Sequence, residues 1–378
     1  MKIVYCIAGT YNSGGMERVL ANKANWLTAH GHEVTIVTSD QRGRKPFFAL
    51  DSRIRCFDLG IDYEATNSRS FFTKFSRYPL KKWRHRRRLS KLLRRLRPDI
   101  TVSMFCGEAS FLPSIADGSR KVLEVHFSRF KRLQYGRRGL WRLADRWLSR
   151  ADLLTARRFD RFVTLTRQDS AYWSGIDDIE VIPNAVSFET DDTADTSSRT
   201  VIAVGRLSHQ KGFDRLLDAW AEAVAANPGW QLKIYGSGPL RQQLQQHIDE
   251  LGISSSAHIC APVGDIRGAY LEASILAMTS RYEGLPMALI EAQTCGLPIV
   301  AMSCKCGPAD VVSNGVDGWL TPDDDTAAFA SRLSQLMADS DMRRRFALRA
   351  RENSRRFATD RIMARWTDLF HRLTSSPQ

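Results

Sequence analysis

The sequence feature that most constrains the fold is an alternation of short apolar segments with amphipathic ones, which occurs twice along the chain. Residues 2–9 (KIVYCIAG) form an apolar run bounded by turn residues, which is typical of a buried strand. A glycine-rich turn follows, then apolar residues at helical spacing over 16–31, and then a second apolar run over 32–40. Strand, turn, helix and strand in this order predict a parallel, doubly wound α/β sheet.

The same alternation restarts after residue 200. In the first half, further strands are expected at 99–105, 121–127, 162–166 and 180–184. In the second half, strands are expected at 200–206, 230–236, 274–280 and 297–303, and helices at 212–226, 239–252 and 286–295. Two such halves predict two Rossmann-like domains.

The domain boundary is expected at residues 187–199, which are polar and acidic and lack apolar periodicity. We therefore assign an N-terminal domain to 1–186 and a C-terminal domain to 200–358. The final segment, 359–378, contains a helix long enough to cross back onto the first domain. A chain of 378 residues is comfortable for two domains.

Composition narrows the class of partner and the compartment. The net charge of +14, with a pI near 9.7, indicates an anionic partner such as a phosphate ligand, a lipid surface or nucleic acid. Seven scattered cysteines, of which Cys304 and Cys306 are nearest, suggest reduced thiols and a cytoplasmic protein. The apolar run at the start is too short for a signal peptide, and we expect no transmembrane helix.

The turn after the first strand (GTYNSGG) is a candidate anion site. Gly14 and Gly15 leave backbone N–H groups accessible at the positive end of the following helix. The alternative is a plain tight turn. The motif is not G-x-G-x-x-G, so the dinucleotide-binding signal is weak.

The corresponding loop of the second half is GRLSHQKG, residues 205–212. Arg206 and Lys211 flank a loop between a strand and a helix, where a fork-shaped and a point cation suit a diphosphate. The alternative is a pair of solvated surface charges. Gly236 and Gly238 end the next strand, where they either admit a ligand or merely turn the chain.

The stretch EGLPMALIEAQTCG places carboxylates beside an apolar helix. Pro286 is expected to start that helix, and Gly284 and Leu285 to bring backbone N–H groups near a ligand. Glu291 lies about five residues into the helix and Glu283 just outside it. Sugar hydroxyls are suitable donors to such carboxylates. The alternative is that Glu283 caps the helix and Glu291 pairs with an arginine.

These motifs together resemble a known family. GRLSHQKG (205–212), YGSGP (235–239) and EGLPMALIE (283–291), in this order, resemble the family 4 retaining glycosyltransferases of the GT-B fold. NSGGMERV (12–19) and GPADVVSNGVDGWL (307–320) are similar to the branch that makes bacterial polysaccharides and lipid-linked oligosaccharides. The resemblance spans nearly the whole chain. It implies two Rossmann-like domains facing across a cleft, with the N-terminal domain on the acceptor side and the C-terminal domain binding the nucleotide-sugar.

The resemblance also implies the chemistry. The enzyme would move a hexosyl unit from a nucleotide-sugar, taken as UDP-linked, to a hydroxyl of a growing, lipid-linked glycan, with retention and without a cofactor. No protein nucleophile is needed, because stabilising the departing diphosphate is the hard step. Asp323–Asp325 contain a D-x-D, but the motif leads into a helix, so we interpret it as an N-cap and expect no essential metal.

The residue roles follow from the same resemblance. It gives the diphosphate to Arg206 and Lys211, the donor-sugar hydroxyls to Glu283 and the ribose to Glu291. His126 matches the family's strand-end histidine that contacts the donor sugar, although a lone strand-end histidine is more often structural. The catalytic set is His126, Arg206, Lys211 and Glu283; the donor-binding set is Gly15, Gly205, Arg206, Lys211, Gly236, Glu283, Gly284, Leu285, Pro286 and Glu291. Phe127 departs from the family pattern and leaves the acceptor contacts near it open.

The basic residues are concentrated. Residues 69–97 contain 13 Lys and Arg and no acid, and 120–161 are also basic. Leucines 89, 92, 93 and 96 share one helical face beneath this charge, which favours peripheral contact with anionic lipid at the inner face of the membrane. The predicted membrane contacts are Lys81, Lys82, Trp83, Arg86, Arg87, Arg88, Arg94 and Arg95. The alternative is a solvated helix whose leucines pack on the domain.

Two other classes of function compete. An NAD-dependent oxidoreductase would use Asp40 as a ribose ligand, but the missing G-x-G-x-x-G argues against it. A nucleic-acid-binding protein would explain the charge but would leave Glu283, Glu291, Arg206 and Lys211 without a role, and no such motif is visible. We therefore expect a glycosyltransferase without a nucleic-acid partner.

Overall fold

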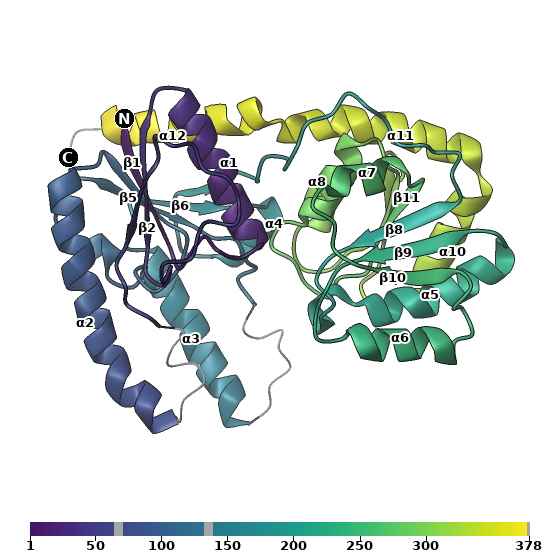
Figure 1. The fold of residues 1–378 in the computed structure, drawn as a ribbon, viewed down its shortest axis with the longest axis horizontal. Coiled ribbons are helices and arrows are strands. Elements are labelled where there is room, and N and C mark those ends of the chain that lie inside the picture. The colour runs from purple at the N-terminus through teal and green to yellow at the C-terminus, as the bar shows by residue number, and fades with distance from the viewer. Residues whose placement is uncertain (64–70, 132–138, 376–378) are drawn as a thin grey trace. The chain divides into compact units, whose positions relative to one another are not determined.

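A computed structural model of the protein describes residues 1–63, 71–131 and 139–375. The chain divides into two compact units (Figure 1). Unit 1 comprises Met1–Leu165, Ser170–Ala185 and Asp360–Gln378, and unit 2 comprises Thr166–Asp169 and Val186–Thr359. The short segment 166–169, which the sequence suggested for the N-terminal domain, thus clusters with unit 2.

Unit 1 contains a seven-stranded sheet in which every pair of neighbouring strands is parallel. Its strands are β1 (Lys2–Ile7), β2 (Glu33–Thr38), β3 (Arg55–Asp58), β4 (Ile100–Ser103), β5 (Arg120–Glu124), β6 (Arg161–Thr164) and β7 (Ile179–Val181). Their order is β3-β2-β1-β4-β5-β6-β7. Strand order therefore reverses between β1 and β4, as in a Rossmann fold.

Helices cover both faces of this sheet. They are α1 (Gly15–Ala29), α2 (Phe71–Leu96), α3 (Leu140–Ala156), α4 (Arg167–Tyr172) and α12 (Thr359–Ser375). Alternate residues of β1 point to opposite faces: Ile3 and Tyr5 share a core with α1 and α12, whereas Val4 shares one with α2. The final helix is thus part of the core of unit 1.

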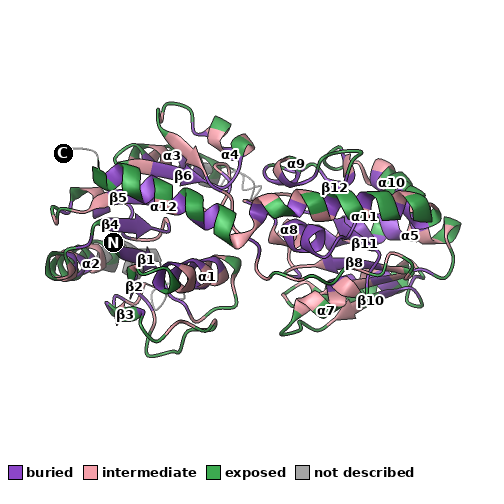
Figure 2. Cartoon of the chain, turned by 90° about the horizontal axis from the view of Figure 1, so that it is seen from above, coloured by how far each residue is buried: buried purple, intermediate pink, exposed green. Residues whose placement is uncertain are grey.

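Burial along α12 follows its amphipathic pattern. Ile362, Met363, Trp366, Leu369 and Phe370 are buried, and exposed residues alternate with them along the helix (Figure 2). Spacing of three and four residues places the apolar side chains on one face. The helix therefore packs against the sheet of unit 1 through an apolar stripe.

Unit 2 repeats the architecture with a six-stranded parallel sheet. Its strands are β8 (Thr200–Val204), β9 (Gln231–Tyr235), β10 (Ala257–Cys260), β11 (Ile275–Met278), β12 (Ile299–Met302) and β13 (Gly318–Thr321). Its helices are α5 (Phe213–Ala226), α6 (Arg241–Glu250), α7 (Ile266–Leu271), α8 (Met287–Thr294), α9 (Pro308–Val311), α10 (Thr326–Ala338) and α11 (Ser340–Ser354). The order β10-β9-β8-β11-β12-β13 reverses between β8 and β11. The predicted pair of Rossmann-like domains is confirmed.

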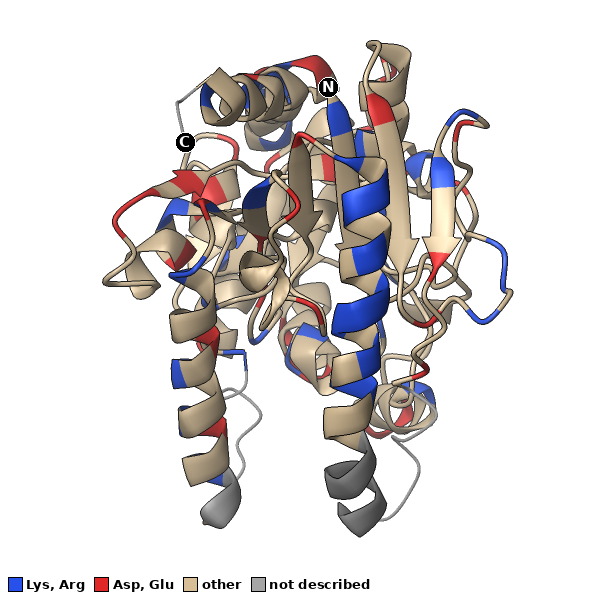
Figure 3. Cartoon of the chain, turned by 90° about the vertical axis from the view of Figure 1, so that its left-hand side faces the viewer, with Lys and Arg blue, Asp and Glu red and all other residues tan. Residues whose placement is uncertain are grey.

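The helix α2 corrects part of the membrane prediction. Leu89 and Leu93 are fully buried in the core of unit 1, so these leucines cannot enter a lipid interface. The basic residues form a stripe along the outer side of the helix (Figure 3). The basic runs also reach into 69–70 and 132–138, which lie outside the described residues. Within the described part of the chain, no helix combines the length and apolarity that crossing a membrane requires.

We predict that Leu93→Ala lowers the free energy of unfolding of unit 1 by about 2–5 kcal/mol, because it leaves a cavity between α2 and the sheet. Amide hydrogen exchange in β1 measures this change. Arg94→Ala, an exposed neighbour, is the matched control and should change the value by less than about 0.5 kcal/mol. Equal effects of the two substitutions would contradict the packing of α2 described above.

Candidate active site

The switch point of unit 2 brings two predicted site loops together. The carboxyl ends of β8 and β11 lie side by side, and ligands of open α/β sheets bind beyond such ends. Residues 205–212 follow β8, and residues 279–286 follow β11. Thr279 donates a 2.8 Å hydrogen bond to the Gly212 carbonyl, and the Arg281 amide donates to the Gln210 carbonyl at 2.8 Å. These bonds fix one loop against the other.

Lys211 and Glu283 form an ion pair across these loops. The Lys211 Nζ lies 2.6 Å from Glu283 Oε1, and the two side chains are 21% and 7% exposed. A carboxylate this far removed from water is costly unless it is paired. The structure therefore joins a predicted diphosphate ligand directly to a predicted sugar ligand.

Arg206 lies on the same loop but is exposed. Its side chain makes no ion pair or hydrogen bond within the part of the chain that the structure describes. Its neighbour Gly205 lies against the aliphatic stem of Lys211, and a Cβ there would lie 3.0 Å from Cε of that lysine. Two cations, one paired and one available to an anion, thus follow β8.

Gly236 and Gly238 have a structural role. A Cβ on Gly236 would overlap the Gly205 carbonyl oxygen, and one on Gly238 would overlap the Leu207 carbonyl oxygen. The Leu207 amide also donates to the Ser237 carbonyl at 2.9 Å. The glycines therefore let the loop after β9 pack against the backbone of the loop after β8.

Glu291 is buried within α8, and Tyr270 of α7 donates a 2.9 Å hydrogen bond to its Oε2. This tyrosine was not among the predicted site residues. The sequence carries little sign of this role, because a tyrosine in a short helix is typical of an ordinary core residue. Tyr270 is indeed fully buried. Tyr270 holds the carboxylate whose predicted partner is a ribose.

The start of α8 differs slightly from the prediction. Pro286 is the N-cap and Met287 the first helical residue, so proline does not occupy the first helical position. Leu285 is buried, and the amides of Gly284 and Leu285 donate no hydrogen bond among the described residues. Two backbone donors therefore remain beside Glu283.

The aspartate run before α10 is used structurally. Asp325 caps the helix by accepting a 2.9 Å hydrogen bond from the Ala328 amide, which confirms the predicted N-cap. Asp323 and Asp324 accept from the Arg215 guanidinium at 3.3 and 3.0 Å. Each acid of the run that contains the D-x-D therefore has a partner within unit 2.

In unit 1, Gly15 is the first residue of α1, and a Cβ there would meet no atom within 4 Å. The carboxylate of Glu17, however, lies against Gly14 at the same helix end. Burial raises the pKa of Glu17. The predicted anion site therefore already has an acidic side chain beside it.

His126 lies two residues beyond the end of β5, at the carboxyl edge of the sheet of unit 1. Its side chain is 8% exposed, and its Nε2 lies 3.0 Å from Glu124 Oε1. Asp40, the ribose ligand of the oxidoreductase alternative, is buried and accepts a 2.6 Å hydrogen bond from Ser39.

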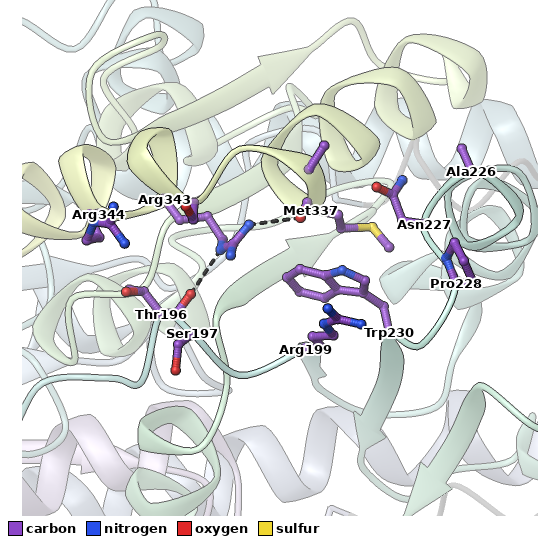
Figure 4. A pocket seen from close by; sticks show the side chains of 12 residues that line it. Thr196, Ser197, Arg199, Ala226, Asn227, Pro228, Trp230, Met337, Arg343 and Arg344 are labelled. Atoms are coloured by element: carbon purple, nitrogen blue, oxygen red, sulfur yellow. Dashed lines mark hydrogen bonds between the residues drawn. The ribbon is translucent and has the colours of Figure 1, made fainter.

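A hollow of about 500 Å³ in unit 2 lies away from these residues (Figure 4). Its wall includes Trp230, the residue before β9, and the arginines 199, 343 and 344. The Arg343 guanidinium donates to the Thr196 and Met337 carbonyls, both at 2.9 Å. Since it lies at the amino ends of β8 and β9, this hollow does not belong to the switch-point site.

Comparison with known proteins identifies the family. The model of the glycosyl transferases group 1 matches residues 189–353, and the model of Glycosyltransferase Family 4 matches residues 13–190. The chain belongs to the family 4 glycosyltransferases. This membership decides against the oxidoreductase alternative.

Relatives of this glycosyltransferase match over nearly its whole length. It is 29% identical to the amylovoran biosynthesis glycosyltransferase AmsD of Erwinia amylovora, over 98% of this chain and 99% of the relative. It is 25% identical, over 98% of each chain, to the GalNAc-alpha-(1->4)-GalNAc-alpha-(1->3)-diNAcBac-PP-undecaprenol alpha-1,4-N-acetyl-D-galactosaminyltransferase of Campylobacter jejuni.

A solved structure shows the same fold. A TarM mutant of S. aureus, in complex with fondaparinux, alpha-GlcNAc-glycerol and UDP, superposes with a TM-score of 0.76 at 14% identity. The match covers 98% of this glycosyltransferase and 99% of the TarM chain.

Glu108 is a buried acid of unit 1 that sequence reasoning missed. It lies beyond β4 and accepts a 2.6 Å hydrogen bond from Ser103. Burial raises the pKa of its carboxyl to about 6 from 4.5. The pKa of Glu108 is higher in the folded state than in the unfolded state. The stability that its protonated carboxyl contributes is therefore fully present below pH 4.5 and is lost as the pH rises through 6.

We predict that Glu108→Gln stabilises unit 1 by about 2 kcal/mol at pH 7.5 and has little effect at pH 4, since a shift of about 1.5 pKa units corresponds to that energy. The amide keeps an acceptor for Ser103. Urea denaturation at the two pH values measures the difference. Glu33→Gln, whose side chain is 60% exposed, is the control. A gain that is equal at both pH values would contradict the raised pKa.

Proposed function

We propose that this glycosyltransferase moves a hexosyl unit from a UDP-linked sugar to a hydroxyl of a lipid-linked glycan, with retention, during synthesis of a bacterial polysaccharide. The observation that carries the proposal is the Lys211–Glu283 pair at the switch point of unit 2. It provides a cation for a diphosphate and a carboxylate for sugar hydroxyls at adjoining positions.

The donor would be held by the two loops of that switch point. Lys211 and the exposed Arg206 would bind the diphosphate, and the free amides of Gly284 and Leu285 would add donors. Glu283 would accept from hydroxyls of the sugar, while Glu291, fixed by Tyr270, would accept from the ribose. UDP is supported by the ligand named in the TarM structure, which has the same fold.

The acceptor is inferred from the relatives. AmsD is named for amylovoran biosynthesis, and the name of the Campylobacter enzyme specifies an acceptor linked through PP to undecaprenol. Both relatives match this chain over nearly its full length. A polysaccharide intermediate on a polyprenyl diphosphate is therefore the proposed acceptor.

The proposed mechanism needs no protein nucleophile and no metal. As the bond between the sugar and the diphosphate breaks, negative charge grows on the phosphate oxygens, and Arg206 and Lys211 stabilise it. The leaving phosphate oxygen takes the proton of the acceptor hydroxyl, which attacks from the same face and gives retention. His126 would contact the donor sugar during this step.

We predict that Lys211→Ala lowers kcat by about 10²–10⁴-fold with UDP-sugars and a polyprenyl-linked acceptor, because the leaving group loses a cation. Glu283→Gln should chiefly lower kcat, and Glu291→Gln should chiefly raise the KM for the donor. All assays contain a chelator. Lys233→Ala, on β9 of the same unit, is the matched control.

Two outcomes would count against this assignment. Near-normal turnover by a folded Lys211→Ala variant would remove Lys211 from the diphosphate site. Strict dependence of the parent enzyme on added Mg²⁺ or Mn²⁺ would contradict the metal-independent mechanism.

We further propose that unit 1 binds anionic membrane at the inner face through α2 and α3. Lys81 and Arg88 leave the predicted contact set, because they donate to the carbonyls of Asp62 and Leu59 within unit 1. The remaining predicted contacts are Lys82, Trp83, Arg86, Arg87, Arg94 and Arg95.

The helix α3 adds exposed apolar side chains to this surface. Leu143, Trp147 and Leu154 are exposed, with Trp147 at 70%. Both helices extend beyond the same edge of the sheet (Figures 1 and 3).

We predict that the protein sediments with vesicles rich in acidic lipid, is released at high salt, and ignores neutral vesicles, because screening acts over about 8–10 Å. Replacing Arg86, Arg87, Arg94 and Arg95 by Gln should weaken this binding. The control replaces Arg344, Arg345, Arg349 and Arg355, exposed residues of unit 2, and loses the same charge. Equal binding by both variants, or tighter binding to duplex DNA than to vesicles, would contradict the proposal.

A further inference from the structure

A buried lysine–glutamate pair lies in unit 1, at a place for which neither the family resemblance nor the motifs predicted one. Lys23 of α1 donates to both carboxylate oxygens of Glu124, the last residue of β5, at 2.6 and 2.7 Å. The two side chains are 5% and 0% exposed. Taking two charges out of water is expensive, and apolar residues of similar volume usually serve stability as well. Stability alone therefore does not explain the pair.

His126 lies beside this ion pair. The His126 Nε2 lies 3.0 Å from Glu124 Oε1, within ion-pair distance, although the ring N–H is not in line with that oxygen. Burial on its own would raise the pKa of the Glu124 carboxyl, but the neighbouring charges and hydrogen bonds, those of Lys23 above all, outweigh burial and hold that pKa at about 2. Glu124 is therefore an ionised acceptor without a proton to donate.

This arrangement selects one form of the imidazole ring. An ionised oxygen 3.0 Å from Nε2 repels a lone pair on that nitrogen and attracts a hydrogen there, even when it lies off the N–H axis, so the charge of Glu124 favours hydrogen on Nε2. Lys23 already neutralises Glu124, so the carboxylate needs only a neutral donor from the ring. Nδ1 is then left as an acceptor.

The lysine is itself held in place. Its Nζ lies 3.7 Å from the ring centroid of Trp366 on α12 and 5.9 Å from that of Tyr5 on β1. Cations over aromatic faces are attracted to the ring, most strongly when they are desolvated. Glu17 of α1 also interacts electrostatically with His126.

We propose that Glu124 is a positioning residue that, charge-balanced by Lys23, fixes His126 as its Nε2–H tautomer and presents Nδ1 as an acceptor to a hydroxyl of the donor sugar. The catalytic part of this inference rests on the proposed function, because it needs His126 to contact the sugar. The tautomer itself does not depend on any substrate. Where a histidine binds a metal, removing the partner that orients its ring typically costs about 10–100-fold in affinity or activity, and we expect a loss of the same order here.

The test compares two double variants of the full chain. Lys23→Met with Glu124→Leu removes both charges and the acceptor, whereas Lys23→Met with Glu124→Gln removes both charges but keeps an acceptor oxygen. Nitrogen-15 NMR of the ring-labelled histidines reports the tautomer at pH 8, and His126→Asn assigns the signal. Replacing the exposed pair Arg55 and Glu33 by Gln is the control.

We expect His126 to show the NMR signals of the Nε2–H tautomer in the parent, in the control and in the double variant that contains Glu124→Gln (the Gln-containing pair). These signals should be lost in the double variant that contains Glu124→Leu (the Leu-containing pair). Turnover of the UDP-sugar should fall about 10–100-fold in the Leu-containing pair, with the donor KM changed less than about threefold, and should recover in the Gln-containing pair. If the Leu-containing pair does not fold, Glu124→Asp, which withdraws the carboxylate, replaces it.

An Nδ1–H pattern in the parent, or a tautomer unchanged on removing the acceptor, would overturn the inference. An Nε2–H pattern that responds as expected, in a parent that turns over no nucleotide-sugar, would instead overturn the proposed function and leave the positioning role intact.

Discussion

The parallel pairing of every strand is the constraint on which the candidate site depends. Because all strands of a sheet run in one direction, all of their carboxyl ends lie at one edge, and the loops that follow them meet there. The reversal of strand order between β8 and β11 separates the helices that follow these strands. Lys211 and Glu283, 72 residues apart in the sequence, come within 2.6 Å for this reason.

Among the described residues, the lysine–glutamate pairs Lys211–Glu283 and Lys23–Glu124 differ in a way that fits different roles. Lys211 remains one-fifth exposed, so an anionic ligand can compete with Glu283 for its ammonium. Lys23 is enclosed by Glu124, Trp366 and Tyr5, and no ligand can reach it without opening the core. The first pair is suited to exchange partners during a reaction, and the second to hold a neighbouring ring still.

The sequence could predict the central strands, the two sheets and the switch-point loops, because long apolar runs and flanking Gly and Pro mark them. It did not reveal β3, β10 and β13, which are four-residue edge strands with weak apolar patterns. It also missed the burial of Lys23 and Glu124, because a charged side chain enters the core only with a partner, here 101 residues away. The hydrogen bonds that Lys81 and Arg88 donate likewise depend on loops whose positions the sequence does not predict.

The membership of α12 in unit 1 has a consequence for how the chain is made. Unit 2 is almost continuous from residue 186 to 359, whereas unit 1 combines segments that precede and follow unit 2 in the sequence. During synthesis, unit 2 can therefore complete its core while β1 still lacks the apolar face of α12. Unit 1, whose sheet is translated before unit 2, therefore finishes folding after it, and the nearer of the two aromatic rings beside Lys23, that of Trp366, is added only then.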